Sequence, residues 1–190
     1  RIVQAVREAG IEEETYVVFT SDHGDWLGDH GLLLKGPMHY DGLIRVGMLV
    51  AGPGIPKGAV VDQPVSLVDL HPTFLEIAGV ADDRPRHGRS LVPVIAGEET
   101  RSHSYLEWHL AASRCGVELQ LRTVRTPTRK LTVDLISAAG ELYDLANDPY
   151  ETRNRWDDPA YRDDRHALMA QVAARPADEL AEPLPVVGMA

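Results

Sequence analysis

The chain has 190 residues, 44% of them apolar, and its 29 acidic and 19 basic side chains give a net charge of −10. This composition is that of an ordinary globular protein, large enough for one core or for the end of one domain plus a small second domain. The acidic balance and the lack of a dense Lys/Arg run argue against nucleic acid as a partner. No apolar stretch approaches the roughly 20 residues that span a bilayer, so we expect no membrane contact. A single cysteine, Cys115, excludes an internal disulfide framework and leaves the location open between cytoplasm and periplasm or exterior.

The first part of the chain is predicted to belong to an α/β domain. An amphipathic helix over residues 1–9 ends at Gly10, and an apolar strand follows over residues 16–20. Residues 43–51 form a second apolar run that ends at a Gly-Pro turn. Helix, short loop and apolar strand make half of a βαβ unit, which indicates the C-terminal part of a mostly parallel sheet flanked by helices.

Two further helices are expected before the chain changes character. Asp69 can cap a helix over residues 70–78, with Gly79 at its end, and a short helix is expected within residues 88–97. After about Glu98 the pattern becomes short strands with partial alternation, which predicts a small antiparallel sheet with a C-terminal covering helix. These predicted elements are strands 104–108, 118–124, 130–134 and 141–145 and a helix over 161–174. The predicted domains are therefore residues 1–98 and 99–175, followed by a Pro-containing tail over 176–190.

The chemistry of the chain is concentrated directly after the first strand. Asp22 and His23 follow it on a glycine-rich turn, and ligands of open α/β sheets bind beyond the carboxyl ends of parallel strands. The pair offers one hard oxygen and one imidazole nitrogen to a divalent ion, but a metal normally needs four or more ligands. On the residues alone, metal ligation and simple capping of a turn stay open as alternatives. Asp25 and Asp29 could join the ligands or be solvated turn residues.

Lys35 and His39 are the other polar candidates in this loop. The stem of Lys35 can pack beside a leucine triplet while its ammonium group reaches an anion, although a lone loop lysine is usually solvated. His39 could supply a proton or a hydrogen bond to a leaving group, or serve as a structural contact. The remaining histidines are scattered and show no ligand spacing.

Four segments of the chain resemble the sulfatase family of the alkaline phosphatase superfamily. FTSDHGDWLGDHGL at residues 19–32, with KGPMHY at 35–40, is similar to the late metal-binding motif of that family. Residues 45–54, then 65–73 with 88–91, and finally 140–149 with Glu151 and Asn154 resemble the segments that follow it in order. The resemblance spans roughly residues 1–160, and the ordered series is far more specific than any one segment.

The resemblance implies roles for individual residues. Asp22 and His23 would bind one divalent metal ion, Ca²⁺ or alternatively Mn²⁺, with His23 standing where many sulfatases have Asn and related phosphonate and phosphate ester hydrolases have His. Lys35 would bind an oxygen of the substrate and act in catalysis, with His39 as a leaving-group contact. The family nucleophile is a formylglycine in an N-terminal Cys- or Ser-x-Pro-x-Arg motif, which this sequence lacks. Cys115 is followed by Gly-Val-Glu and does not fit that motif.

The preferred interpretation is the C-terminal portion of a metal-dependent sulfatase that hydrolyses sulfuric esters, inactive without the rest of the protein. A phosphonate monoester or phosphodiester hydrolase of the same superfamily is the first alternative, and an inactive fragment or interaction-only relative is the second. The expected partners are a small anionic ester substrate and the missing N-terminal half. Because half a sheet leaves an apolar edge and face, we also expect self-association, pairing with the remainder, or an exposed patch.

Overall fold

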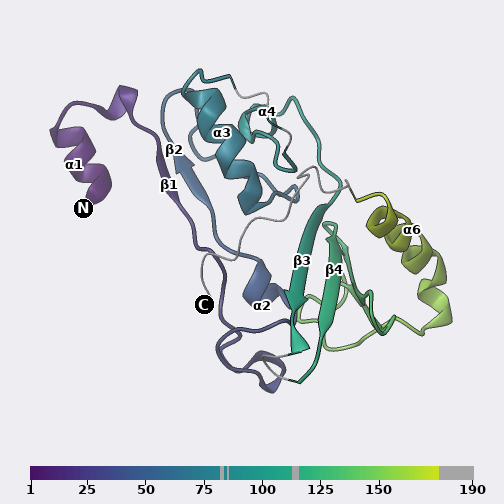
Figure 1. The fold of residues 1–190 in the computed structure, drawn as a ribbon. Helices are drawn as coiled ribbons and strands as arrows, with labels where there is room; N and C mark the ends of the chain where they lie inside the picture. The colour runs from purple at the N-terminus through teal and green to yellow at the C-terminus, as the bar shows by residue number, and fades with distance from the viewer. Residues whose placement is uncertain (82–83, 85, 113–115, 176–190) are drawn as a thin grey trace.

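The computed structural model describes residues 1–81, 84, 86–112 and 116–175, and it shows a mixed α/β chain in two regions (Figure 1). The helices are α1 (Ile2–Glu8), α2 (Asp41–Ile44), α3 (Leu70–Ile77), α4 (Val92–Ile95) and α6 (Arg162–Ala173), with 3₁₀ turns at Glu12–Glu14, Asp29–Gly31, Leu67–Asp69 and Pro159–Tyr161. The strands are β1 (Val17–Phe19), β2 (Leu49–Ala51), β3 (Ser104–Leu110), β4 (Leu119–Arg125), β5 (Arg129–Asp134) and β6 (Gly140–Asp144). Cys115 and the tail over 176–190 lie outside the described residues, and the division between residues 98 and 99 stays a prediction.

The two strands of the first region pair antiparallel, with Val17 opposite Ala51 and Phe19 opposite Leu49. This pair is antiparallel, within a domain whose sheet is predicted to be mostly parallel. A parallel pair needs a crossover connection, usually a helix that packs on the sheet. The connection between β1 and β2 contains the 3₁₀ turn at Asp29–Gly31, the one-turn helix α2 and otherwise irregular chain, so it is a long loop and not a crossover of that kind.

The strand predicted over residues 43–51 forms only in its second half. Residues 41–44 make α2 instead, and its Leu43 is 4% exposed. An apolar run of this length can be read as strand or as buried helix from its periodicity alone. Contacts from the second region to Asp41, described below, hold the first turn of this helix in place.

Helix α3 lies beside β2, and α4 lies on the other side of α3 (Figure 1). Asp69 stands at the N-cap position of α3 as predicted, but its side chain instead closes a capping box with Ser66 around the preceding 3₁₀ turn. Its carboxylate is also bound by Arg101 Nη1 at 2.7 Å, and both side chains are buried. Gly79, at φ +65°, ends α3 as expected. Helix α4 is shorter than the range predicted for it.

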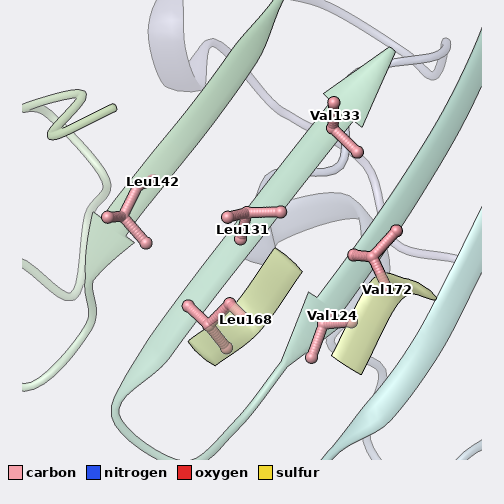
Figure 2. Packing of buried hydrophobic residues seen from close by; sticks show 6 residues of the cluster. All are labelled: Val124, Leu131, Val133, Leu142, Leu168 and Val172. Atoms are coloured by element: carbon pink, nitrogen blue, oxygen red, sulfur yellow. The ribbon is translucent and has the colours of Figure 1, made fainter. Parts of the chain in front are cut away.

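The second region confirms the predicted small antiparallel sheet, with strand order β3-β4-β5-β6. Side chains alternate across a strand, so neighbouring residues of β5 face opposite sides. Leu131 and Val133 point to one side and pack in the core with Leu142, Leu168 and Val172 (Figure 2). Lys130 and Thr132 point to the other side, where Lys130 contacts His39 of the first region and Thr132 bonds Thr123 of β4.

Helix α6 covers the apolar side of this sheet, as predicted, and lies on the side away from β1 and β2 (Figure 1). Its Leu168 and Val172 are each 4% exposed and reach Val124 and Leu131 of the sheet (Figure 2). The core of the second region is therefore formed by one sheet face and one helix, which leaves the opposite sheet face for contacts with the first region.

One face of the β1-β2 pair is uncovered. Phe19 and Leu49 lie directly opposite each other and are 68% and 69% exposed, whereas Val18 and Val50 face α3 and α4. Ile2 and Val3 of α1 are exposed as well, and α1 buries none of its residues. These side chains provide the exposed apolar surface that the sequence predicts. Among the described residues, no helix is long and apolar enough to cross a membrane.

Candidate metal and anion site

Asp22 and His23 lie where the sequence predicts them, directly after β1. The Asp22 Oδ1 atom accepts a hydrogen bond from the His23 amide at 3.0 Å, and this bond is the main cause that lowers the pKa of Asp22. The carboxylate is therefore ionised, which is the form that binds a cation. Ser21 Oγ donates to the His23 carbonyl at 2.6 Å and closes the turn. The Asp22 side chain is largely exposed and open to a ligand.

The position of the His23 proton follows from its hydrogen bonds. His23 Nδ1 lies 2.7 Å from the Gly24 carbonyl oxygen, which can only accept, so Nδ1 carries the proton. Nε2 is then left with a lone pair, and it lies 3.0 Å from Lys35 Nζ and 3.6 Å from Asp22 Oδ2. The structure thus brings together Asp22, His23 and Lys35, three of the predicted residues.

The donor atoms fit part of a divalent metal site. An ionised carboxylate and an imidazole that binds through Nε2 are ligands that hard and borderline divalent ions accept. The described residues contain no group of three or more His, Cys, Asp or Glu side chains that could hold an ion. The remaining ligands of such an ion would therefore come from outside this pair.

Trp26 packs against the segment of chain that carries Lys35. The Trp26 amide donates to the Leu34 carbonyl at 3.2 Å, and a Cβ atom added to Gly36 would lie 2.8 Å from the Trp26 ring. Lys35 is thus flanked on both sides by residues that contact Trp26, which is 5% exposed. Only glycine fits at position 36 without displacing the ring.

The loop stores backbone strain. Leu27, His30 and Leu34 adopt positive φ angles of 49°, 54° and 65°, a conformation that costs non-glycine residues about 1–3 kcal/mol each and persists where the surroundings fix it. Such strain is typical of ligand-binding loops. Asp25 is used locally, because its Oδ1 accepts from the Leu27 amide at 2.8 Å, so it caps the turn.

Gly24 joins the turn that carries Asp22 and His23 to α2. Its amide donates to the Leu43 carbonyl at 2.7 Å, and an added Cβ would lie 2.0 Å from the Gly42 carbonyl oxygen. The two backbones approach so closely that no side chain fits between them. The position of His23 is therefore tied to α2 through its neighbour in the sequence.

His39 makes its contacts on the face of the small sheet. It is 5% exposed, its Nδ1 lies 2.7 Å from Thr123 Oγ1, and Thr123 Oγ1 in turn lies 2.8 Å from Thr132 Oγ1. Burial, together with the charge of Lys130, lowers the pKa of His39 to about 4. A leaving-group role for His39 stays a prediction of the resemblance, whereas the structure uses the neutral ring as a packed hydrogen-bonding group.

The lowered pKa of His39 predicts a pH-dependent stability. The unfolded chain binds a proton on this ring below about pH 6.5, whereas the folded chain does so only near pH 4. The free energy of unfolding should therefore fall by about 3 kcal/mol from this group as the pH drops from 6.5 to 4. Urea unfolding at pH 7, 5.5 and 4 measures it, with His39→Gln for comparison. Equal pH slopes in the wild type and the variant would contradict the assignment.

Four charged residues of structural importance were not singled out as site residues from the sequence: Asp41, Arg125, Lys130 and Glu151. Asp41 is 84 residues from Arg125 and 110 residues from Glu151 along the chain, so local patterns cannot pair them. The alternation of β5 does give one signal, because it places Lys130 on the sheet face opposite to the core residue Leu131. Glu151 belongs to a segment that carries the resemblance, but its partner was not apparent.

A cavity of about 250 Å³ lies between the β1-β2 pair and helices α3 and α4. Its lining is mainly apolar and includes Val18, Val50 and Phe74. Asp22, His23 and Lys35 are not part of the lining, so the cavity does not extend the site.

Comparison with known proteins identifies the family. A family model described as N-sulphoglucosamine sulphohydrolase, C-terminal, matches residues 28–178. Delta 4,5-hexuronate-2-O-sulfatase of Bacteroides thetaiotaomicron is 33% identical across 94% of this chain and 38% of its own length.

Solved structures agree with this match. A 2-O GAG sulfatase superposes with a TM-score of 0.79 at 32% identity, over 92% of this chain and 39% of its own. A phosphonate monoester hydrolase of Agrobacterium radiobacter gives 0.78 at 29% identity, over 92% of this chain and 37% of its own. The chain thus spans well under half the length of these relatives. It belongs to the sulfatase family, of which it represents the C-terminal portion.

Proposed function

We propose that this chain is the C-terminal part of a metal-dependent sulfatase that hydrolyses sulfuric esters. One observation carries the proposal: the Asp22 carboxylate, the His23 Nε2 lone pair and the Lys35 ammonium group converge at the end of β1, with His23 Nε2 3.0 Å from Lys35 Nζ and 3.6 Å from Asp22 Oδ2. The similarity to sulfatases over nearly the whole chain supports the same assignment.

Each of the three residues has a part in the proposed reaction. Asp22 and His23 Nε2 would hold a divalent ion, which supplies the positive charge that polarises the ester and the nucleophile. Lys35 would bind an oxygen of the substrate sulfate and stabilise the charge that develops as the ester bond breaks. Nε2 has one lone pair, so if it bound an ion it could no longer accept from Lys35, whose ammonium group would then be available to the anion.

The nucleophile would come from residues outside this sequence. The family resemblance implies a formylglycine there, together with the remaining acidic metal ligands. Covalent catalysis needs an activated nucleophile within bonding reach, so the chain by itself should be inactive. We propose Ca²⁺ as the ion, with Mn²⁺ as the alternative that His23 would also suit.

The uncovered face of the β1-β2 pair is the proposed docking surface for the rest of the protein. Phe19 and Leu49 are large, apolar and exposed, and a sheet with one bare apolar face is typical of a layered domain that lacks a layer. Reading the encoding DNA upstream of Arg1 tests whether the N-terminal part that would cover this surface is encoded there. An open frame with the Cys- or Ser-x-Pro-x-Arg motif is expected, and its absence would favour the inactive or interaction-only alternative.

A phosphonate monoester or phosphodiester hydrolase is the second candidate. His23 favours it, and so does the similarity to the phosphonate monoester hydrolase. The full-length protein should hydrolyse an aryl sulfate faster than the matching aryl phosphonate monoester if the first proposal is right. Two of the relatives are named a hexuronate-2-O-sulfatase and a 2-O GAG sulfatase, so a 2-O-sulfated uronic acid is a first natural substrate to assay. Faster turnover of the phosphonate would overturn the assignment in favour of the second.

A further inference from the structure

Three side chains of the second region form hydrogen bonds with one short segment of the first region, residues 39–41. Arg125 holds the Asp41 carboxylate with two hydrogen bonds, from Nε to Oδ1 at 3.1 Å and from Nη2 to Oδ2 at 2.7 Å. Glu151 Oε2 accepts from the Asp41 amide at 2.7 Å. Lys130 Nζ donates to the His39 carbonyl and forms an ion pair with Glu151. The segment is thus fixed through a carboxylate, an amide and a carbonyl.

The group is buried and balanced in charge. The Lys130 and Glu151 side chains are 1% and 2% exposed, and Asp41 and Arg125 are 16% and 17% exposed. Two cations face two anions, and the Lys130 ammonium also lies 5.9 Å and 5.8 Å from the ring centres of Tyr40 and Tyr143. Burial tends to raise the pKa of Asp41, but the hydrogen bond from Arg125 and the charge of Lys130 outweigh it and leave the pKa lowered. Asp41 is therefore ionised and remains a partner of Arg125.

Residues 39–41 are connected to both parts of the candidate site, Lys35 and the turn that carries His23. On one side, Lys35 precedes it by four residues. On the other side, it opens α2, whose Leu43 carbonyl accepts the Gly24 amide next to His23. The positions of the metal-binding turn and of the anion-binding lysine therefore both depend on residues 39–41.

We propose that Asp41, Arg125, Lys130 and Glu151 form a clamp through which the C-terminal sheet positions His23 and Lys35 relative to each other. They are positioning residues, because none of them contacts the site atoms. The inference rests on the proposed function for its effect on the reaction, but the mechanical coupling from the clamp to Gly24 does not depend on the substrate.

The chemistry of the clamp favours positioning over bulk stabilisation. Buried ion pairs seldom stabilise a fold more than well-packed apolar residues would, because the cost of desolvation offsets their attraction. They do fix geometry, since bidentate arginine and backbone hydrogen bonds are directional. The apolar packing of the sheet lies on its other face, with α6. A displacement of about 1 Å in a reacting group can cost about 10²-fold in rate, so such fixation matters at a site.

The test compares Asp41→Asn with Asp164→Asn in the full-length protein. Asp164 is a matched control, because it also bonds an arginine of the sheet, Arg129 Nε, at 2.7 Å, but lies on α6 away from the site. Amide hydrogen exchange is measured at Gly24, and kcat and KM are measured for sulfate ester hydrolysis. Arg125→Lys, which keeps the charge and loses the bidentate contact, provides a milder variant in case Asp41→Asn folds poorly.

Asp41→Asn should speed exchange at Gly24 about tenfold or more and lower kcat about tenfold or more. Arg125→Lys should give a smaller change in the same direction, and Asp164→Asn should change neither quantity. Exchange within β5 should stay slow in all variants, which separates loss of positioning from general unfolding. Unchanged Gly24 exchange in both clamp variants would overturn the clamp. Absence of sulfatase activity in the wild type would instead count against the proposed function, while the exchange result would still decide the inference.

Discussion

Replacing Lys35 by alanine in the full-length protein is expected to lower kcat/KM for sulfate ester hydrolysis by about 10²–10³-fold. In the proposed site this ammonium group binds the substrate sulfate, and removal of one such preorganised charge or donor typically costs a factor of this size. Stability should hardly change, because the Lys35 side chain is exposed and its described contact is with His23.

Lys57→Ala is the matched control for this experiment. Lys57 is an exposed loop lysine beside a proline and a glycine, and it lies in the turn after β2, outside the segment that carries Asp22, His23 and Lys35. Its loss should leave kcat/KM and the melting temperature unchanged. If Lys35→Ala and Lys57→Ala behave alike, Lys35 has no role at the anion.

Lys130→Met should destabilise the protein by about 3–5 kcal/mol. The substitution keeps the length of the side chain but leaves Glu151 as a buried carboxylate without its cation, and removal of one partner of a buried pair usually costs this much. Denaturant unfolding measures the change in the free energy of unfolding. The same variant should also loosen residues 39–41, since the His39 carbonyl loses its donor.

The double variant Lys130→Met/Glu151→Gln separates the charge effect from packing. Neutralising Glu151 removes the uncompensated charge, so the double variant should recover part of the lost stability. If the two substitutions are simply additive, the Lys130–Glu151 pair is not coupled and the burial of charge is not the cause.

The second region was the more predictable part of the fold. Its strands alternate inward and outward residues, and local alternation is enough to indicate paired strands with one buried face. The covering helix followed from apolar residues at helical spacing, and α6 indeed places Leu168 and Val172 against the sheet. Strand bounds differ from the prediction by at most two residues, because the turn residues between strands mark their ends.

The first region was less predictable because its order depends on distant residues. The run over 43–51 carries no periodicity that separates strand from helix, and contacts from Arg125 and Glu151 hold its start as α2. The antiparallel pairing of β1 and β2 depends on a long connection whose path no local pattern sets. The clamp joins residues 84 to 110 positions apart, a distance that sequence periodicity cannot bridge.

The sequence predicts which residues make up the candidate site but not how their side chains are arranged. Asp22, His23 and Lys35 follow from their motif, and the structure brings all three to one point. The tautomer of His23 required the Gly24 carbonyl, and the packing of Lys35 required Trp26 and Gly36. His39 shows the limit of the motif, because a ring near a site in sequence is here bonded to Thr123 on the sheet.

Metal content is the most direct test of the central claim, which is that Asp22 and His23 are one half of a divalent metal site. The full-length protein, dialysed against metal-free buffer and analysed by mass spectrometry, should retain about one divalent ion per molecule. Asp22→Ala and His23→Ala should each lose most of it, while Asp164→Asn retains it. An unchanged metal content in both site variants would contradict the account.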